Sequence, residues 1–113
     1  MGGIEKFLIY NKNNHALYAL LKKAVPGLSQ AQIRLILCMN KKSYQAIDLA
    51  YRLQVTPQSA GQLIKRSSHL LEALEIDLDD RRGRTYKLSE DGFAFLALLK
   101  EALETGKAKA ILR

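Results

Sequence analysis

The chain has 113 residues, 48% of them hydrophobic and 26% charged, which is typical of one globular domain and excludes a disordered or fibrous protein. No apolar stretch reaches the about 20 residues that span a bilayer, no signal peptide is visible, and a single cysteine excludes an intramolecular disulfide, so we expect no membrane association and a cytoplasmic location. Lys and Arg outnumber Asp and Glu by 18 to 11, and this net charge of +7 favours an anionic partner, nucleic acid first.

The first predicted helix precedes residue 26. Its apolar residues follow the i, i+3, i+4, i+7 spacing of one helix face: Leu17, Leu20, Leu21 and Ala24. Asn13 or Asn14 is expected to cap this helix at its N-terminus, and Pro26-Gly27 is expected to end it.

A second helix is predicted by a capping box. Ser29 and Gln32 stand three residues apart, so each side chain can bond the backbone N–H of the other residue. The helix that follows is expected to run to about Asn40. We expect Cys38, inside this helix, to be a small core residue rather than a redox-active thiol.

The third and fourth predicted helices are joined by a turn of three residues. Ser43 is expected to cap the third helix, whose buried face holds Ala46, Leu49, Ala50 and Leu53. Gln54 stands in the turn where glycine often supplies a left-handed conformation. Thr56 is expected as the N-cap of the fourth helix and Pro57 as its first residue. Apolar spacing continues to Leu74, and the pair has the pattern of a helix-turn-helix.

After the fourth helix the pattern changes from helical to alternating. Residues 75–79 and 85–88 predict the two strands of a β-hairpin, with Gly83 in its charged turn. Ser89 is expected to cap a last helix that ends near Gly106. This helix has two apolar stripes, which predicts burial on two sides: Phe93, Leu96, Leu99 and Leu103 form one, and Phe95, Leu98 and Ala102 form the other.

The predicted fold class is therefore mainly α with a small β-hairpin, in the order helix, helix, helix, helix, hairpin, helix. We expect a single winged helix-turn-helix domain over residues 1–113. Within it, residues 43–68 form the helix-turn-helix and residues 74–88 the wing. Residues 1–27 and 89–113 hold the first and last helices.

The fourth helix is the candidate recognition helix. Its predicted outward residues are short and polar near its start and basic later: Gln58, Ser59, Gly61, Gln62, Lys65 and Arg66. Amides can pair with adenine edges and arginine with guanine or phosphate, so this face suits the major groove of DNA. The alternative is a solvated helix face.

Basic residues elsewhere fit the same hypothesis. Three arginines at the hairpin tip are candidates for a minor groove, and Asp80 is expected to orient them: Arg81, Arg82 and Arg84. Cations in the first half are expected to attract the phosphate backbone generally: Lys22, Lys23, Arg34, Lys41, Lys42 and Arg52.

Three segments carry a resemblance to a known family: LSQAQIRLILCM, AIDLAYRLQVTPQSAGQLIKR and DDRRGRTYKLSEDG. Through them, residues 28–104 resemble the winged helix-turn-helix core of MarR-type transcriptional regulators. The third segment matches the family's wing, in which an arginine-containing turn and a strand lead into Leu-Ser/Thr-x-x-Gly. The sequence lacks the Gly-containing turn that usually follows the recognition helix, since residues 68–76 hold no glycine.

The resemblance implies a sequence-specific regulator that binds double-stranded DNA as a homodimer, most simply a repressor. It implies dimer contacts through residues 4–24 and 89–105, so the segments 1–27 and 89–113 are the predicted dimerisation helices. By the resemblance, Thr56 lies near a phosphate, Arg82 contacts the minor groove and Asp80 positions that arginine. The residues expected to contact bases or the DNA backbone are Gln58, Ser59, Gln62 and Arg66. The family often binds phenolic effectors in a pocket, but the chain is short at both ends, so we expect this pocket to be reduced or absent and a small-molecule effector to be doubtful.

No enzyme is predicted. His15 and His69, the second expected at the trailing end of the fourth helix, lie far apart in a sequence with one cysteine, so no metal site or Cys/His pair is expected. No nucleotide-binding motif is present, and no cofactor is expected. The alternative function is a winged-helix protein-interaction module, such as an adaptor in plasmid or phage segregation or replication, favoured by the acidic residues of 75–79 and the doubly apolar last helix.

Overall fold

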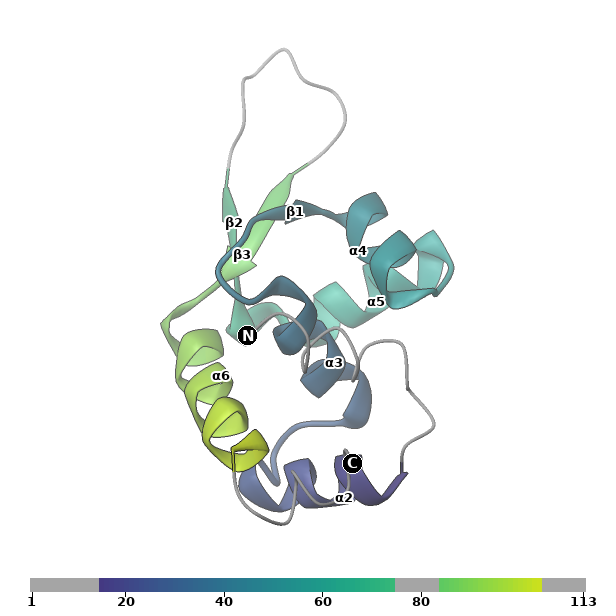
Figure 1. Ribbon diagram of the computed structural model, residues 1–113. Coiled ribbons are helices and arrows are strands. Elements are labelled where there is room, and N and C mark those ends of the chain that lie inside the picture. Colours follow the sequence, from purple (N-terminus) through teal and green to yellow (C-terminus); the bar gives the residue numbers. More distant parts are fainter. Residues whose placement is uncertain (1–14, 75–83, 105–113) are drawn as a thin grey trace.

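The computed structural model describes residues 15–74 and 84–104, and this part of the chain is mainly helical with a small antiparallel sheet, as predicted (Figure 1). The predicted caps Asn13 and Asn14, the predicted strand 75–79 and the predicted stop at Gly106 lie outside the described residues. The elements, in chain order, are α2 (His15–Ala24), α3 (Gln30–Met39), β1 (Tyr44–Gln45), α4 (Ala46–Leu53), α5 (Pro57–Arg66), the 3-10 helix η1 (Ser68–Leu70), β2 (Leu71–Leu74), β3 (Thr85–Leu88) and α6 (Glu90–Leu103).

Helix α3 is the centre of the core and contacts α2, α4, α6 and β3. Figure 1 shows α6 on one side of α3, the α4–α5 pair on the other, and α2 across the base. The predicted capping box is confirmed: the backbone N–H of Gln32 donates to Ser29 Oγ at 3.2 Å, and that of Ser29 donates to Gln32 Oε1 at 3.0 Å. Every residue from Ile33 to Met39 is buried, and the predicted core position of Cys38 is confirmed.

The sheet has the strand order β1–β3–β2, with both pairs antiparallel. Strand β1 was not predicted: Tyr44 pairs with Tyr86 and Gln45 with Thr85. The expected cap at Ser43 is wrong, because the pairing holds Gln45 in an extended conformation and α4 begins only after it. Gln45 is the N-cap and makes no side-chain capping bond.

Helix α5 ends earlier than predicted. The apolar spacing suggested a helix to Leu74, but Ser67 is the C-cap, η1 follows, and β2 begins at Leu71. The placement of His69 at the end of α5 is therefore also wrong, since it lies in η1. Serines compete with helix formation through local hydrogen bonds, and pairing with β3 gives residues 71–74 better backbone partners than another helical turn.

Helix α6 starts as predicted, with Ser89 Oγ accepting the backbone N–H of Gly92 at 3.2 Å. One face of the helix is buried against α2 and α3, through Leu96, Leu99 and Leu103. Each predicted stripe also leaves one large side chain exposed, Phe93 of the first at 40% and Leu98 of the second at 44%. Phe95 and Ala102 of the second stripe are partly buried against the core, so burial of α6 on two sides is only partial within the described residues.

The packing around residue 92 explains why the Leu-Ser-x-x-Gly segment has a glycine there. A Cβ at this position would collide with the carbonyl oxygen of Leu70 and approach the Leu88 side chain to 3.1 Å. That carbonyl accepts the backbone N–H of Ser89 at 2.9 Å, and Ser89 Oγ donates to the carbonyl of His69 at 2.9 Å. Glycine therefore allows the first turn of α6 to pack directly on η1.

Candidate nucleic-acid interface

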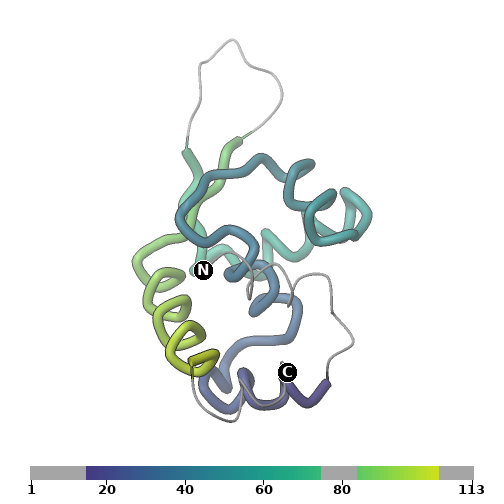
Figure 2. The backbone as a smooth tube through the Cα atoms, in the orientation of Figure 1, coloured from purple at the N-terminus to yellow at the C-terminus, as the bar shows by residue number. Residues whose placement is uncertain are grey.

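Helices α4 and α5 pack against each other across a tight turn (Figure 2). Gln54 ends α4 in the left-handed conformation, with φ 58° and ψ 45°. Its backbone N–H donates to Tyr51 O at 3.2 Å, and that of Val55 donates to Ala50 O at 3.0 Å. This is the Schellman pattern of a helix C-terminus, formed here with glutamine where glycine is usual.

The start of α5 is fixed by its cap, as predicted. Thr56 Oγ1 accepts the backbone N–H of Ser59 at 3.1 Å, and Pro57 is at the start of the helix. The Thr56 hydroxyl donates to Ser59 Oγ at 2.9 Å. Ser59 Oγ accepts in this bond, so its own hydroxyl can still donate to another acceptor. The first turn of α5 contains no acidic residue, so its positive dipole end is not neutralised locally.

Helix α5 has one exposed polar face and one buried apolar face. At 100° per residue, the predicted DNA-binding side chains cover an arc of about 120°, and all of them are exposed: Gln58, Ser59, Gln62, Lys65 and Arg66. The opposite face is buried against the body of the protein through Ala60, Leu63 and Ile64. The exposed arc contains two cations and no carboxylate.

Part of the predicted wing lies outside the described residues, namely Asp80, Arg81 and Arg82. Arg84 is described and exposed, directly before β3. Residue Leu74 pairs with Thr85, so the ends of β2 and β3 that lead into this segment are adjacent. Across the same pair of strands, Lys87 Nζ lies 3.6 Å from Glu72 Oε2.

Arg34 does not belong with the surface cations. It is 8% exposed in the core, and its Nη2 donates to the carbonyl of Leu53 at 2.8 Å. Its guanidinium also hydrogen-bonds the Tyr18 hydroxyl of α2. Grouping Arg34 with the cations that attract the phosphate backbone from the surface is therefore wrong. The signal in the sequence was its position in an otherwise apolar run, since a cation buried there needs specific partners.

The other five of these first-half cations are exposed: Lys22, Lys23, Lys41, Lys42 and Arg52. The Arg52 guanidinium lies 4.8 Å from the centre of the Tyr44 ring, a cation–π contact that ties α4 to β1.

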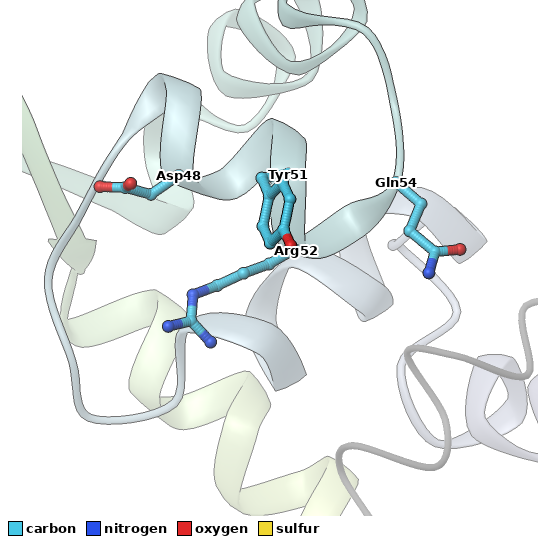
Figure 3. Close-up of a pocket in the computed structure, with 4 residues that line it drawn as sticks. All are labelled: Asp48, Tyr51, Arg52 and Gln54. Carbon is cyan, nitrogen blue, oxygen red and sulfur yellow. The ribbon is translucent and has the colours of Figure 1, made fainter.

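An open pocket on the outer side of α4 is lined by Asp48, Tyr51, Arg52 and Gln54 (Figure 3). Asp48 and Gln54 lie at opposite ends of this pocket and point apart, so the four side chains do not converge on one position. The same helix exposes two large apolar side chains, Ile47 at 65% and Tyr51 at 87%. A solvent-exposed pair of this kind one turn apart is a feature of contact surfaces.

The Cys38 thiol in the core is kept in its neutral, protonated form. Burial raises the pKa of the Cys38 thiol to about 11, against the opposing effect of Arg52 and Arg34. A protonated, buried thiol is a poor nucleophile and a poor metal ligand. In the two described stretches, no three His, Cys, Asp or Glu side chains gather closely enough to hold a metal ion. No helix there is long and apolar enough to cross a bilayer.

The fold has a counterpart among solved structures. The crystal structure of RV1404 from Mycobacterium tuberculosis matches it with a TM-score of 0.72, over 87% of this chain and 68% of that chain. The two sequences are 18% identical, so the likeness is one of fold. No model of a protein family matches the sequence, and no curated protein matches it.

Proposed function

We propose that the protein is a MarR-type winged helix-turn-helix regulator that binds double-stranded DNA as a homodimer and represses transcription. In this proposal α4, its turn and α5 form the helix-turn-helix, and β2, β3 and their connection form the wing. The observation that carries it is the exposed face of α5, which has two amides, a hydroxyl and two cations on a helix whose opposite side is buried. The proposal assigns the protein no catalytic activity.

The chemistry of that face suits the major groove. The amides of Gln58 and Gln62 can each donate and accept, which matches the N6 and N7 edge of adenine. The Ser59 hydroxyl has its oxygen occupied by Thr56 and its hydrogen available for a base or phosphate acceptor. Lys65 and Arg66 follow in the last turn, where cations can contact phosphates. Arg81, Arg82 and Arg84 would enter the adjacent minor groove, with Asp80 orienting them.

The homodimer is supported by the uncovered face of α6. Phe93 and Leu98 are large apolar side chains left partly exposed, and burying such surface is the main driving force of association. In a two-fold dimer, two copies of α5 would enter successive major grooves about 34 Å apart. Leu98→Glu should shift the protein to monomer in analytical ultracentrifugation. Ile47→Glu, which replaces an exposed apolar side chain of α4 outside this face by the same charge, serves as the control.

DNA binding is tested by its salt dependence. Each phosphate contact releases about one counterion. The double variant Lys65→Ala/Arg66→Ala should therefore bind duplex DNA more weakly, with a slope of log affinity against log salt that is shallower by about 1 to 2. The comparison variant is Lys22→Ala/Lys23→Ala, which removes two exposed cations of α2 that would attract DNA only generally, so its slope should change less. Equal slopes for the two double variants would refute the assignment of α5 to the interface.

A protein-interaction module remains the second candidate, because Ile47 and Tyr51 form an exposed apolar pair on α4. Aromatic residues are enriched in protein–protein interfaces. The absence of any duplex binding at low salt, together with a partner that co-purifies with the wild-type protein and is lost with Tyr51→Ala, would favour this function over DNA recognition.

A further inference from the structure

We infer that Arg34 is a positioning residue for DNA recognition, whose buried guanidinium holds the α4–α5 turn, and with it the start of α5, in one place on the body formed by α2 and α3. The inference rests on the proposed DNA binding. Arg34 binds the last residue of α4, so its effect on DNA would pass through the turn that leads from there to α5.

The contact is made at the point where α4 ends. Leu53 is the last residue of α4, and the carbonyls of a helix C-terminus lack partners within the helix. The turn satisfies the carbonyls of Ala50 and Tyr51 with the backbone N–H groups of Val55 and Gln54. Leu53 O instead accepts from Arg34 Nη2 at 2.8 Å, a charge-assisted bond at the negative end of the helix.

The left-handed backbone conformation at Gln54 makes this hydrogen bond important to the turn. Gln54 is one of two non-glycine residues with positive φ in the described chain, and its left-handed conformation is costly for a residue with a Cβ. The carbonyl that Arg34 binds immediately precedes Gln54. Anchoring this peptide unit therefore stabilises the strained conformation directly.

Arg34 is itself fixed from a second helix. Tyr18, which is 1% exposed on α2, hydrogen-bonds the guanidinium, so α2, α3 and the end of α4 meet at one group. Only three residues separate Leu53 from the first residue of α5. A shift of Leu53 would therefore move Thr56 and, with it, Gln58 and Ser59 at the start of the exposed face.

Stability alone does not account for a buried arginine at this place. Replacing a buried charged group by an apolar side chain of similar volume is often neutral or stabilising, because the charge must be desolvated. A polar group retained in the core can instead specify one geometry among several. Here the geometry that Arg34 specifies is the position of the helix proposed to read DNA.

The experiment compares Arg34→Met, which keeps volume but removes the donors, with Arg52→Met, which removes an exposed arginine from α4. Two quantities are measured on the full chain: the amide hydrogen exchange rate of Val55, and the ratio of affinities for a duplex selected from a random pool and a scrambled duplex of equal length. Arg34→Met should accelerate exchange at Val55 about tenfold or more and lower the affinity ratio about tenfold, the effect of one charge-assisted hydrogen bond.

Arg52→Met removes only a general attraction to phosphates, which acts on both duplexes alike, so the exchange rate and the affinity ratio should stay near wild type. Arg34→Met should melt within a few degrees of wild type. Wild-type values of exchange and affinity ratio in Arg34→Met would overturn the inference. So would equal changes in the two variants. If Arg34→Met does not fold, Arg34→Gln, which removes the charge and shortens the polar side chain, decides by the same criteria. Failure of the wild-type protein to bind any duplex refutes the proposed function instead, and the exchange rate at Val55 then decides whether Arg34 holds the turn.

Discussion

Replacing Gly92 by alanine should destabilise the protein, although the same change usually stabilises a helix by about 1 kcal/mol. The new Cβ would collide with the carbonyl oxygen of Leu70 and lie 3.1 Å from the Cβ of Leu88. Leu70 O cannot retreat freely, because it accepts the backbone N–H of Ser89 at 2.9 Å. Overpacking of a core contact costs about 1 to 3 kcal/mol, and a lost hydrogen bond adds about 1 kcal/mol. After the helix-propensity gain, the net loss is about 1 to 3 kcal/mol.

The matched control for this variant is Gly61→Ala in α5. A Cβ at Gly61 meets no atom within 4 Å, so alanine should raise the free energy of unfolding by about 0.5 to 1 kcal/mol. Both variants are compared with wild type by urea unfolding at one protein concentration, because self-association shifts apparent stability. If Gly92→Ala is as stable as Gly61→Ala, the close packing of α6 on η1 is not what requires the glycine.

Three further predictions concern the cap of α5 and two buried groups. Thr56→Ala should lower the free energy of unfolding by about 1 kcal/mol in urea titrations, because the backbone N–H of Ser59 loses its acceptor; an unchanged midpoint would exclude the cap as a stabilising contact. Burial raises the pKa of Tyr18 to about 12, so the folded state keeps a proton that the unfolded state releases from about pH 10 upward. The free energy of unfolding should be unaffected by this group below pH 10 and should fall by at most about 2.7 kcal/mol as the pH rises to 12. Superimposable alkaline unfolding curves for wild type and Tyr18→Phe would contradict this. Because burial raises its pKa, the Cys38 thiol should react with iodoacetamide at neutral pH at least about ten times more slowly in the native protein than in urea. Equal rates would show that the thiol is accessible.

The parts of the fold that the sequence predicted well are those with local signals. The caps at Ser29, Thr56 and Ser89 each depend on a side chain and a backbone N–H three residues away, so the pattern and the structure coincide. Strand β1 depends instead on pairing of Tyr44 with Tyr86, far along the chain, and no local pattern indicates it. The early end of α5 has the same cause, since residues 71–74 bond β3 rather than continue the helix.

The candidate site also has one part that local spacing predicts and another that only the packing of the helices shows. The exposed face of α5 follows from helical spacing alone, because its polar and apolar residues separate at 100° per residue. The burial of Arg34 does not follow from spacing, because charge by itself places an arginine on the surface. Only the packing of α2 and α4 around α3 shows that its partners are the Leu53 carbonyl and the Tyr18 hydroxyl.

The central claim is that the α5 face reads double-stranded DNA in a two-fold complex. It is tested most directly by selecting bound sequences from a random duplex pool with the wild-type protein and measuring the mass of the resulting complex. The account predicts an enriched inverted repeat, with half-sites about 10 base pairs apart and two protomers on each duplex. Recovery of no common sequence, or of an asymmetric site bound by one protomer, would contradict it.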